Sequence, residues 1–171
     1  EATEAALKLM RMHAVKLKKR RRGIICVEGN WHGRTLGAQL MSNNLEQKSW
    51  IGYEDKDIHH IPFPYPWELA ETSGEEFFEK NLNKLKMQGL DPANDICGVM
   101  LETFQGWGAL FYPEGFVQAI ERFCRDSKAL LTFDEMQSGF GRTGKNFGFQ
   151  HYGVTPDLIC VGKGMGGGVP L

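Results

Sequence analysis

Two residues near the end of the chain, Asp134 and Lys163, have the types and the spacing to carry out chemistry together. Each follows a short apolar run, residues 129–133 and residues 158–161, with the length and composition of a buried strand. In an open α/β sheet, ligands bind just beyond the carboxyl ends of the strands. We therefore expect the carboxylate and the amine to lie at one ligand site.

The pair matches the requirements of one cofactor. Lys163 is flanked by glycines in a mostly apolar setting, where desolvation favours the neutral, nucleophilic amine. A buried carboxylate such as Asp134 needs a cationic partner, or it takes up a proton. Pyridoxal phosphate requires both groups, a lysine for its aldehyde and an aspartate for its pyridinium nitrogen. A simpler interpretation is that Asp134 caps a turn and Lys163 is a solvated loop residue.

Four segments resemble the class III (ornithine/4-aminobutyrate/acetylornithine type) pyridoxal-phosphate-dependent aminotransferases. DEMQSGFGRTG (residues 134–144) is similar to the family's DEVQTGFGRTG, and PDLICVGKGMGGGVPL (residues 156–171) to the segment that carries its Schiff-base lysine. Upstream, EATEAALKLMR (residues 1–11) resembles EANEAALKLAR, and NWHGRTLGA (residues 30–38) resembles the YHGRT motif. The four segments follow one another in the family's order.

The resemblance implies roles for five residues around the cofactor. Lys163 would form the Schiff base and then move the proton on the substrate, and Asp134 would keep the ring nitrogen protonated. Trp31 would stack on the ring, and Gln137 would hydrogen-bond the ring hydroxyl. We expect His32 to border the cofactor and to fix the local backbone.

Three further residues are predicted to border the substrate: Arg34, Glu102 and Trp107. Arg34 matches a family arginine that contacts a substrate carboxylate, for which guanidinium is well suited. Glu102 begins ETFQGWGA, which resembles the family's EPIQGEGG loop. Trp107 stands where many members have a second glutamate that holds a mobile arginine, so we expect a bulky or apolar amine, or a sugar-like one.

The elements that position these residues alternate along the chain. Helices are predicted over residues 1–22, 73–89 and 113–127, and strands over residues 24–27, 96–101, 129–133 and 158–161. This order predicts an α/β fold, a three-layer, mostly parallel sheet with helices on both faces, as in the large domain of fold type I transferases of this cofactor. We expect residues 1–171 to be part of that domain, without the N-terminal phosphate turn and the C-terminal small domain. No phosphate ligand is assigned to Glu1 or Ala2.

Composition narrows the classes of partner. With 20 basic and 21 acidic residues, the chain gives no reason to expect nucleic acid or a membrane as partner, and KLKKRRR (residues 16–22) is read as the solvated end of a helix. The four cysteines form no CxxC pair, so we expect no disulfide framework, no metal site and a cytoplasmic setting.

The predicted function is a transaminase that moves an amino group from an amine or amino-acid donor to a keto acid, in a homodimer with a shared active site. An aminomutase, a racemase or a decarboxylase of the same family is an alternative, and a nucleotide-binding α/β module without the cofactor is a remote one. GKGMGGG (residues 162–168) is not a Walker loop, because glycine follows Lys163 where a serine or threonine is needed.

Overall fold

The computed structural model describes residues 1–169, which form an α/β fold around a five-stranded parallel sheet of order β2-β1-β3-β6-β7. The strands are β1 (Gly23–Val27), β2 (Ile58–Ile61), β3 (Ile96–Glu102), β6 (Leu130–Asp134) and β7 (Leu158–Cys160), with a separate hairpin of β4 (Phe104–Gln105) and β5 (Leu110–Phe111). The helices are α1 (Ala2–Lys16), α2 (Leu36–Met41), α3 (Gly74–Met87), α4 (Pro92–Asp95) and α5 (Glu114–Ser127), with short 3-10 turns η1 (Ser49–Ile51) and η2 (Gly148–Tyr152).

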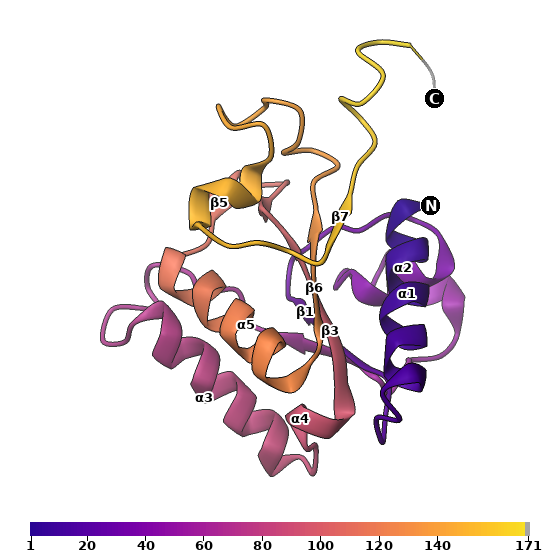
Figure 1. Ribbon diagram of the computed structural model, residues 1–171, viewed down its shortest axis with the longest axis vertical. Coiled ribbons are helices and arrows are strands. Elements are labelled where there is room, and N and C mark those ends of the chain that lie inside the picture. Colours follow the sequence, from indigo (N-terminus) through magenta and orange to yellow (C-terminus); the bar gives the residue numbers. More distant parts are fainter. Residues whose placement is uncertain (170–171) are drawn as a thin grey trace.

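The predicted three-layer arrangement is confirmed. Helices α1 and α2 cover one face of the sheet, and α3 and α5 cover the other (Figure 1). The alternation of side chains along β1 builds both halves of the core, because Ile25 and Val27 pack toward α3 and α5 while Ile24 and Cys26 pack toward α1. A sheet buried on both faces explains why its strands read as continuous apolar runs rather than alternating ones.

Helix α3 begins where the sequence predicts. Ser73 is its N-cap, and its hydroxyl accepts a hydrogen bond from Glu76 N–H at 3.2 Å while the Glu76 carboxylate accepts from Ser73 N–H at 2.8 Å. This reciprocal capping box satisfies two backbone donors that a helix start otherwise leaves unpaired. Helix α5 likewise follows Pro113, which occupies its N-cap position.

The first helix is shorter than predicted, because it ends at Lys16 rather than Arg22. Lys18 turns the chain with a left-handed φ of 55°, and Lys19 Nζ then donates to the carbonyl oxygens of Ala93 and Ser127, both at 2.7 Å. Only the start of the basic run is therefore a solvated helix end, because Lys16 closes α1 and is exposed. The part of the run from Lys19 leaves the helix and contacts α4 and the last residue of α5.

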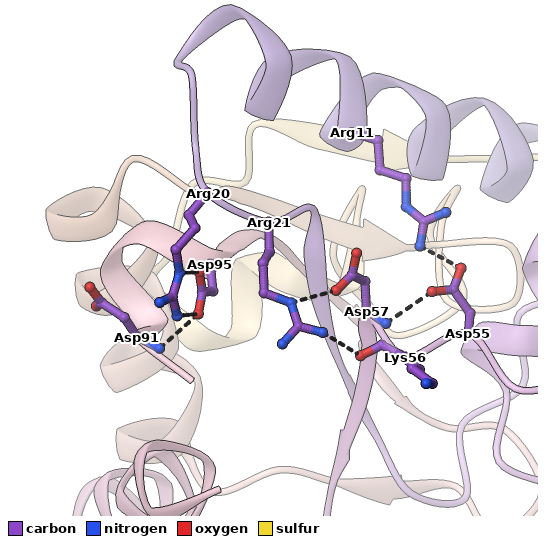
Figure 2. A network of polar contacts seen from close by, with 8 residues as sticks. All are labelled: Arg11, Arg20, Arg21, Asp55, Lys56, Asp57, Asp91 and Asp95. Carbon is purple, nitrogen blue, oxygen red and sulfur yellow. Dashed lines mark hydrogen bonds and ion pairs between the residues drawn. The ribbon is translucent and has the colours of Figure 1, made fainter. Parts of the chain in front are cut away.

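Three arginines form ion pairs at this amino-terminal edge of the sheet (Figure 2). The pairs are Arg11 with Asp55 at 2.7 Å, Arg21 with Asp57 at 2.8 Å, and Arg20 with Asp95. The Asp95 side chain is fully buried, and the hydrogen bonds from Arg20 hold the pKa of its carboxyl below the usual value. These pairs lie at the edge of the sheet opposite to Asp134 and Lys163, so their role is in fold stability.

Candidate functional site

The predicted site residues come together at the carboxyl ends of the parallel strands. Glu102 and Asp134 are the last residues of β3 and β6, and they are paired in the sheet register. Trp31 and His32 lie in the loop after β1, and Lys163 lies in the turn after β7. Four strand ends therefore supply the site, as expected for a parallel sheet.

The buried centre of the site is a contact between Asp134 and His32. His32 Nδ1 lies 2.9 Å from Asp134 Oδ2, and the two side chains are 0% and 2% exposed. The second oxygen, Asp134 Oδ1, accepts from Met136 N–H at 3.1 Å. Asp134 therefore has two kinds of contact. Its Oδ1 caps a turn, as in the simpler interpretation of the sequence, and its Oδ2 faces the imidazole of His32.

The backbone of His32 is fixed by two neighbouring hydroxyls. Thr3 Oγ1 donates to the carbonyl oxygen of His32 at 2.8 Å, and Ser42 Oγ accepts from His32 N–H at 2.9 Å. His32 Nε2 is buried and has no hydrogen-bond partner within the described residues. The prediction that His32 holds local backbone geometry agrees with these contacts, and its ring adds the contact to Asp134.

A cavity of about 200 Å³ gathers the predicted cofactor residues. Its lining includes Trp31, His32, Asp134, Gln137 and Lys163. It adjoins a cavity of about 690 Å³ that shares Lys163 and Gln137, and another of about 490 Å³ that shares Trp31 and Gln137. The five residues, which lie up to 132 positions apart in the sequence, are therefore neighbours around one space.

Lys163 is exposed to solvent rather than enclosed by apolar side chains, as its sequence context had suggested. It lines two of the three cavities and follows Gly162, where an added Cβ would come within 2.5 Å of Met136 Sδ. The glycine lets the turn pass close to Met136. Lys163 is the next residue along this turn, so its backbone also lies close to Met136.

Gln137 lies at the junction of all three cavities. It packs directly on Gly106, where the Cβ of any other residue would collide with Gln137 Oε1. The glycine in the loop after β3 therefore makes room for the amide that follows β6.

Glu102 is a buried carboxyl group with a strongly shifted pKa. Burial raises its pKa to about 7, and the nearby Asp134 carboxylate adds to this, against the opposing effects of His32 and of hydrogen bonds from Trp31 N–H and Gly106 N–H. The bond from Trp31 N–H to Glu102 Oε2 measures 3.1 Å. Glu102 thus links the loop after β1 to the end of β3 and changes charge near neutral pH.

A pH dependence of stability follows from Glu102. An acid whose pKa is higher in the folded state than in the unfolded state stabilises the fold below the unfolded pKa, and this contribution is lost as the pH rises through the folded pKa. Between pH 4.5 and about 7, we expect Glu102 to lower the free energy of unfolding by an amount on the order of 3 kcal/mol. Urea unfolding of the cofactor-free protein at pH 5 and pH 8 tests this, because Glu102→Gln should abolish that share of the pH dependence. An unchanged dependence in the variant would contradict the assignment.

The two remaining predicted substrate residues lie at the rim. Trp107 is 69% exposed and lines the cavity of about 490 Å³ together with Trp31 and Glu102. Arg34 is exposed, and its guanidinium carbon lies 5.1 Å from the centroid of the Trp31 ring, in a cation–π contact. The structure thus brings Arg34 next to the predicted stacking residue, although it does not place Arg34 in the lining of either cavity that Trp31 borders.

Glu135 is a buried carboxylate beside the site that the sequence does not predict. This side chain is 1% exposed, and its carboxylate accepts four hydrogen bonds, from the Thr103 hydroxyl at 2.5 Å, the Ser138 hydroxyl at 2.7 Å, and the N–H groups of Gly148 and Phe149 at 2.9 and 2.8 Å. It therefore ties the loop after β6 to the loop after β3 and to η2. The only local signal is Ser138, three residues after Glu135, and the other partners are distant in sequence.

Removing this carboxylate should destabilise the site. In Glu135→Ala, two hydroxyls and two backbone N–H groups would be left buried without an acceptor, and we expect the free energy of unfolding to fall by about 3 kcal/mol or more. Chemical denaturation measures the change, with Glu79→Ala on the exposed side of α3 as the control. Equal stability of the two variants would show that the four bonds contribute little.

The donor set fits pyridoxal phosphate. Trp31 supplies an aromatic face, Lys163 an amine, Gln137 an amide and Asp134 a buried carboxylate, and all four line one cavity. The Asp134 carboxylate has no lysine or arginine ion pair among the described residues, so a cationic ring N–H would supply the charge that its burial requires. Glu1 and Thr3, at the start of α1, also border the cavity.

Glu4, in the first turn of α1, forms a hydrogen bond with α2. Its carboxylate accepts from Ala38 N–H at 3.0 Å, at the start of α2. Burial raises the pKa of Glu4, but the hydrogen bonds from Thr35 and from the N–H groups of Ala38 and Gly37 outweigh it and leave the pKa below its usual value. The charge of Glu4 is therefore used to cap α2.

Comparison with known proteins gives consistent matches over the whole chain. The family described as Aminotransferase class-III matches residues 1–171. The acetylornithine aminotransferase of Bacillus subtilis (strain 168) is 36% identical over 172 residues, which cover 100% of this chain and 39% of the relative. The 4-aminobutyrate aminotransferase of Mycobacterium leprae (strain TN) is 33% identical over 180 residues, again covering 100% of this chain and 39% of the relative. The chain thus spans about two fifths of the length of these curated relatives.

Solved structures with the same architecture are transaminases. A thermostable (S)-enantioselective omega-transaminase from Thermomicrobium roseum matches with a TM-score of 0.84 and 29% identity, over 99% of this chain and 39% of that one. An amine transaminase from an uncultivated Pseudomonas species, solved in its PLP-bound form, matches with a TM-score of 0.84 and 26% identity, over 99% and 39%. None of the helices within residues 1–169 is long and apolar enough to cross a membrane.

Proposed function

The chain belongs to the class III aminotransferases, and from this premise we propose that it forms part of the cofactor-binding domain of a pyridoxal-phosphate-dependent transaminase. The observation that carries the proposal is the cavity lined jointly by Lys163, Asp134, Trp31 and Gln137. The reaction would move an amino group from an amine or amino-acid donor to a keto acid. When bound, the cofactor supplies an aldehyde that takes the amino group and a ring that takes up the electron pair released at the substrate carbon.

Two residues of the chain carry the chemical step. We assign to Lys163 Nζ the covalent attachment of the cofactor and, once the substrate amine has displaced it, the transfer of the proton to and from the substrate carbon. We assign to the Asp134 carboxylate the role of holding a proton on the ring nitrogen. Because Asp134 is buried and fixed by His32 and Met136 N–H, its charge is oriented before the reaction begins.

The other residues orient the cofactor and the substrate. We propose that Trp31 stacks on the ring, that Gln137 hydrogen-bonds its hydroxyl and that His32 holds Asp134 in place. Arg34, beside Trp31, is the residue proposed to meet a substrate carboxylate, most directly that of the keto acid.

The proposal includes an oligomeric state and a cellular location. A homodimer with a shared active site is proposed from the family, and a cytoplasmic location is proposed from the cysteines. Cys26, Cys97, Cys124 and Cys160 are all free and buried, as suits a reducing compartment. Burial raises the pKa of the Cys97 thiol to about 11 and that of Cys26 to about 12, which keeps both groups protonated and unreactive.

Absorption spectroscopy of the complete parent protein tests the proposed function. We expect the purified protein to be yellow with bound cofactor and to bleach when a suitable amine is added, and a keto acid should then restore the colour and be converted to its amino acid. A colourless protein that takes up no added pyridoxal phosphate would refute the proposal. Isomerisation of the substrate, or release of carbon dioxide from an amino acid to leave an amine, without amino transfer would instead support an aminomutase, a racemase or a decarboxylase.

A further inference from the structure

We propose that the cavity of about 490 Å³ beside Trp31 and Trp107 binds the distal part of the amino donor, and that this part is a neutral, hydroxyl-bearing ring of the sugar type. The inference rests on the proposed function, because it assigns the substrate class of that same site. Three features of the cavity lining carry it: the exposed indole ring of Trp107, two buried amide atoms without partners, and the absence of any cationic side chain among the lining residues.

The lining combines aromatic rings with amides. Trp107 is 69% exposed, so its ring is open to a ligand, and Trp31, which is assigned to the cofactor ring, borders the same space. Five side-chain amides border the same space, those of Asn30, Asn43, Asn44, Gln47 and Gln137. Aromatic rings pack against apolar C–H faces, and amides both donate to and accept from hydroxyl groups. A sugar ring presents both of these surfaces.

Asn30 offers a hydrogen-bond donor with a fixed direction. The residue is 3% exposed, and its Oδ1 accepts from the Tyr112 hydroxyl at 3.0 Å. Tyr112 is itself held in place, because its backbone N–H donates to the hydroxyl of Tyr152 at 3.1 Å. Asn30 Nδ2 is left buried and without a partner. An orphaned donor at a cavity wall costs free energy unless a ligand atom accepts from it.

Gln47 offers the complementary group. Its Oε1 is also buried without a partner, although the residue itself is only partly buried. The wall therefore holds one unpaired donor and one unpaired acceptor. A hydroxyl satisfies either, since it carries one donor and two acceptor positions. A purely apolar amine would leave both atoms unpaired.

The charge of the lining argues against a carboxylate in this space. Among residues 1–169, no lysine or arginine borders the cavity, and Glu102 is the one ionisable side chain in its lining. A substrate carboxylate would here meet amides, indole rings and an acidic group, with no guanidinium to receive it. Arg34 lies against the Trp31 ring but is not part of this lining.

A matched pair of amines tests the inference on the complete parent protein loaded with its cofactor. Methyl 6-amino-6-deoxyhexoside and cyclohexylmethylamine both carry a primary amine on a CH₂ group attached to a six-membered ring. The sugar ring carries hydroxyl groups, and the cyclohexane ring carries none. We expect the amino sugar to bleach the cofactor with a kcat/KM at least about tenfold higher, and N-acetylornithine to be weaker than the amino sugar. As a readout besides activity, saturation-transfer difference NMR should detect binding of a methyl hexoside that has no amine.

Variants locate the effect in the wall. Asn30→Asp keeps the oxygen that accepts from Tyr112 and removes the free N–H donor, so we expect KM for the amino sugar to rise about tenfold while KM for cyclohexylmethylamine stays within about twofold. Gln47→Met removes the unpaired acceptor in a partly exposed residue, and it should also raise KM for the amino sugar. It provides the test if the Asn30 variant folds poorly. Asn83→Asp, on the exposed side of α3, is the matched control and should leave both KM values unchanged.

Each result has a distinct meaning. Preference for cyclohexylmethylamine or N-acetylornithine over the amino sugar, or an unchanged KM ratio in both variants, would overturn the inference while leaving transamination intact. Failure of every amine to bleach a yellow protein, or absence of bound cofactor, would instead refute the proposed function from which this inference starts.

Discussion

Replacing Lys163 with alanine is expected to reduce amino transfer by at least about 10⁴-fold, the largest effect of any single change in this chain. The variant loses the lysine that lines the cavity with Asp134 and Trp31, and with it the proposed covalent attachment of the cofactor and the proposed proton-transfer group. The visible absorption should change as well, because any cofactor that still binds would no longer be attached to the protein. Single-turnover kinetics with a saturating amine measure the first effect, and absorption after reduction with borohydride measures the second.

A control separates this result from a general effect of charge. Lys145 is an exposed lysine in the loop after β6, and Lys145→Ala should leave both the spectrum and the rate unchanged. Added methylamine should partly restore proton transfer in Lys163→Ala, since a free amine can enter a cavity that the missing side chain has vacated. A Lys163→Ala protein that keeps the covalent chromophore would place the attachment on another residue.

The second large effect is expected from Asp134→Asn. The amide keeps the size of the carboxylate and can still contact His32 and Met136 N–H, but it carries no charge to hold a proton on the ring nitrogen. Loss of one oriented group that stabilises developing charge typically costs about 10² to 10³ in kcat. We expect a decrease of this size with little change in the folded structure. Steady-state rates across the pH range, together with circular dichroism, distinguish the loss of charge from misfolding.

Asp126→Asn, on the exposed side of α5, is the matched control for this change and should behave like the original protein. A further consequence concerns Glu102, whose pKa is raised in part by the Asp134 carboxylate. In Asp134→Asn this repulsion is removed, so the Glu102 transition near pH 7 should move to lower pH. A variant with full activity and an unmoved Glu102 transition would mean that the Asp134 charge acts on neither group.

The two carboxyl groups illustrate how one sheet edge gives neighbouring residues different properties. Glu102 and Asp134 are paired across adjacent strands, and both are buried. Asp134 faces the imidazole of His32, whereas Glu102 receives backbone N–H groups, and burial raises the pKa of Glu102 to about 7. A buried acid with a raised pKa of this kind is common at sites of proton transfer.

Several elements were missed by the sequence analysis for a shared reason. Strand β2 is the edge strand of the sheet, and its Ile58–Ile61 segment contains two histidines and no long apolar run. Helices α2 and α4 have six and four residues, too few to display a helical period. Each is stabilised by contacts with distant parts of the chain, such as the hydrogen bond from Ala38 N–H at the start of α2 to Glu4, and such contacts leave no local pattern.

The sequence by itself determined which residues stand at the strand ends. Apolar runs followed by Asp134 and Lys163, and the capping box that begins at Ser73, depend on neighbouring residues alone, so local patterning predicts them. The residue types that line the cavity could be predicted for the same reason, because the motifs around Asp134 and Lys163 are local information.

Only the tertiary structure decided how these groups face one another. The contact between His32 and Asp134 joins residues 102 positions apart, the bond from Thr103 to Glu135 joins residues 32 apart, and the bond that orients Asn30 joins residues 82 apart. Hydrogen bonds and burial at such separations depend on the packing of the whole sheet and its helices. A side chain such as Glu135 therefore reads as unremarkable in the sequence, although folding surrounds it with four donors.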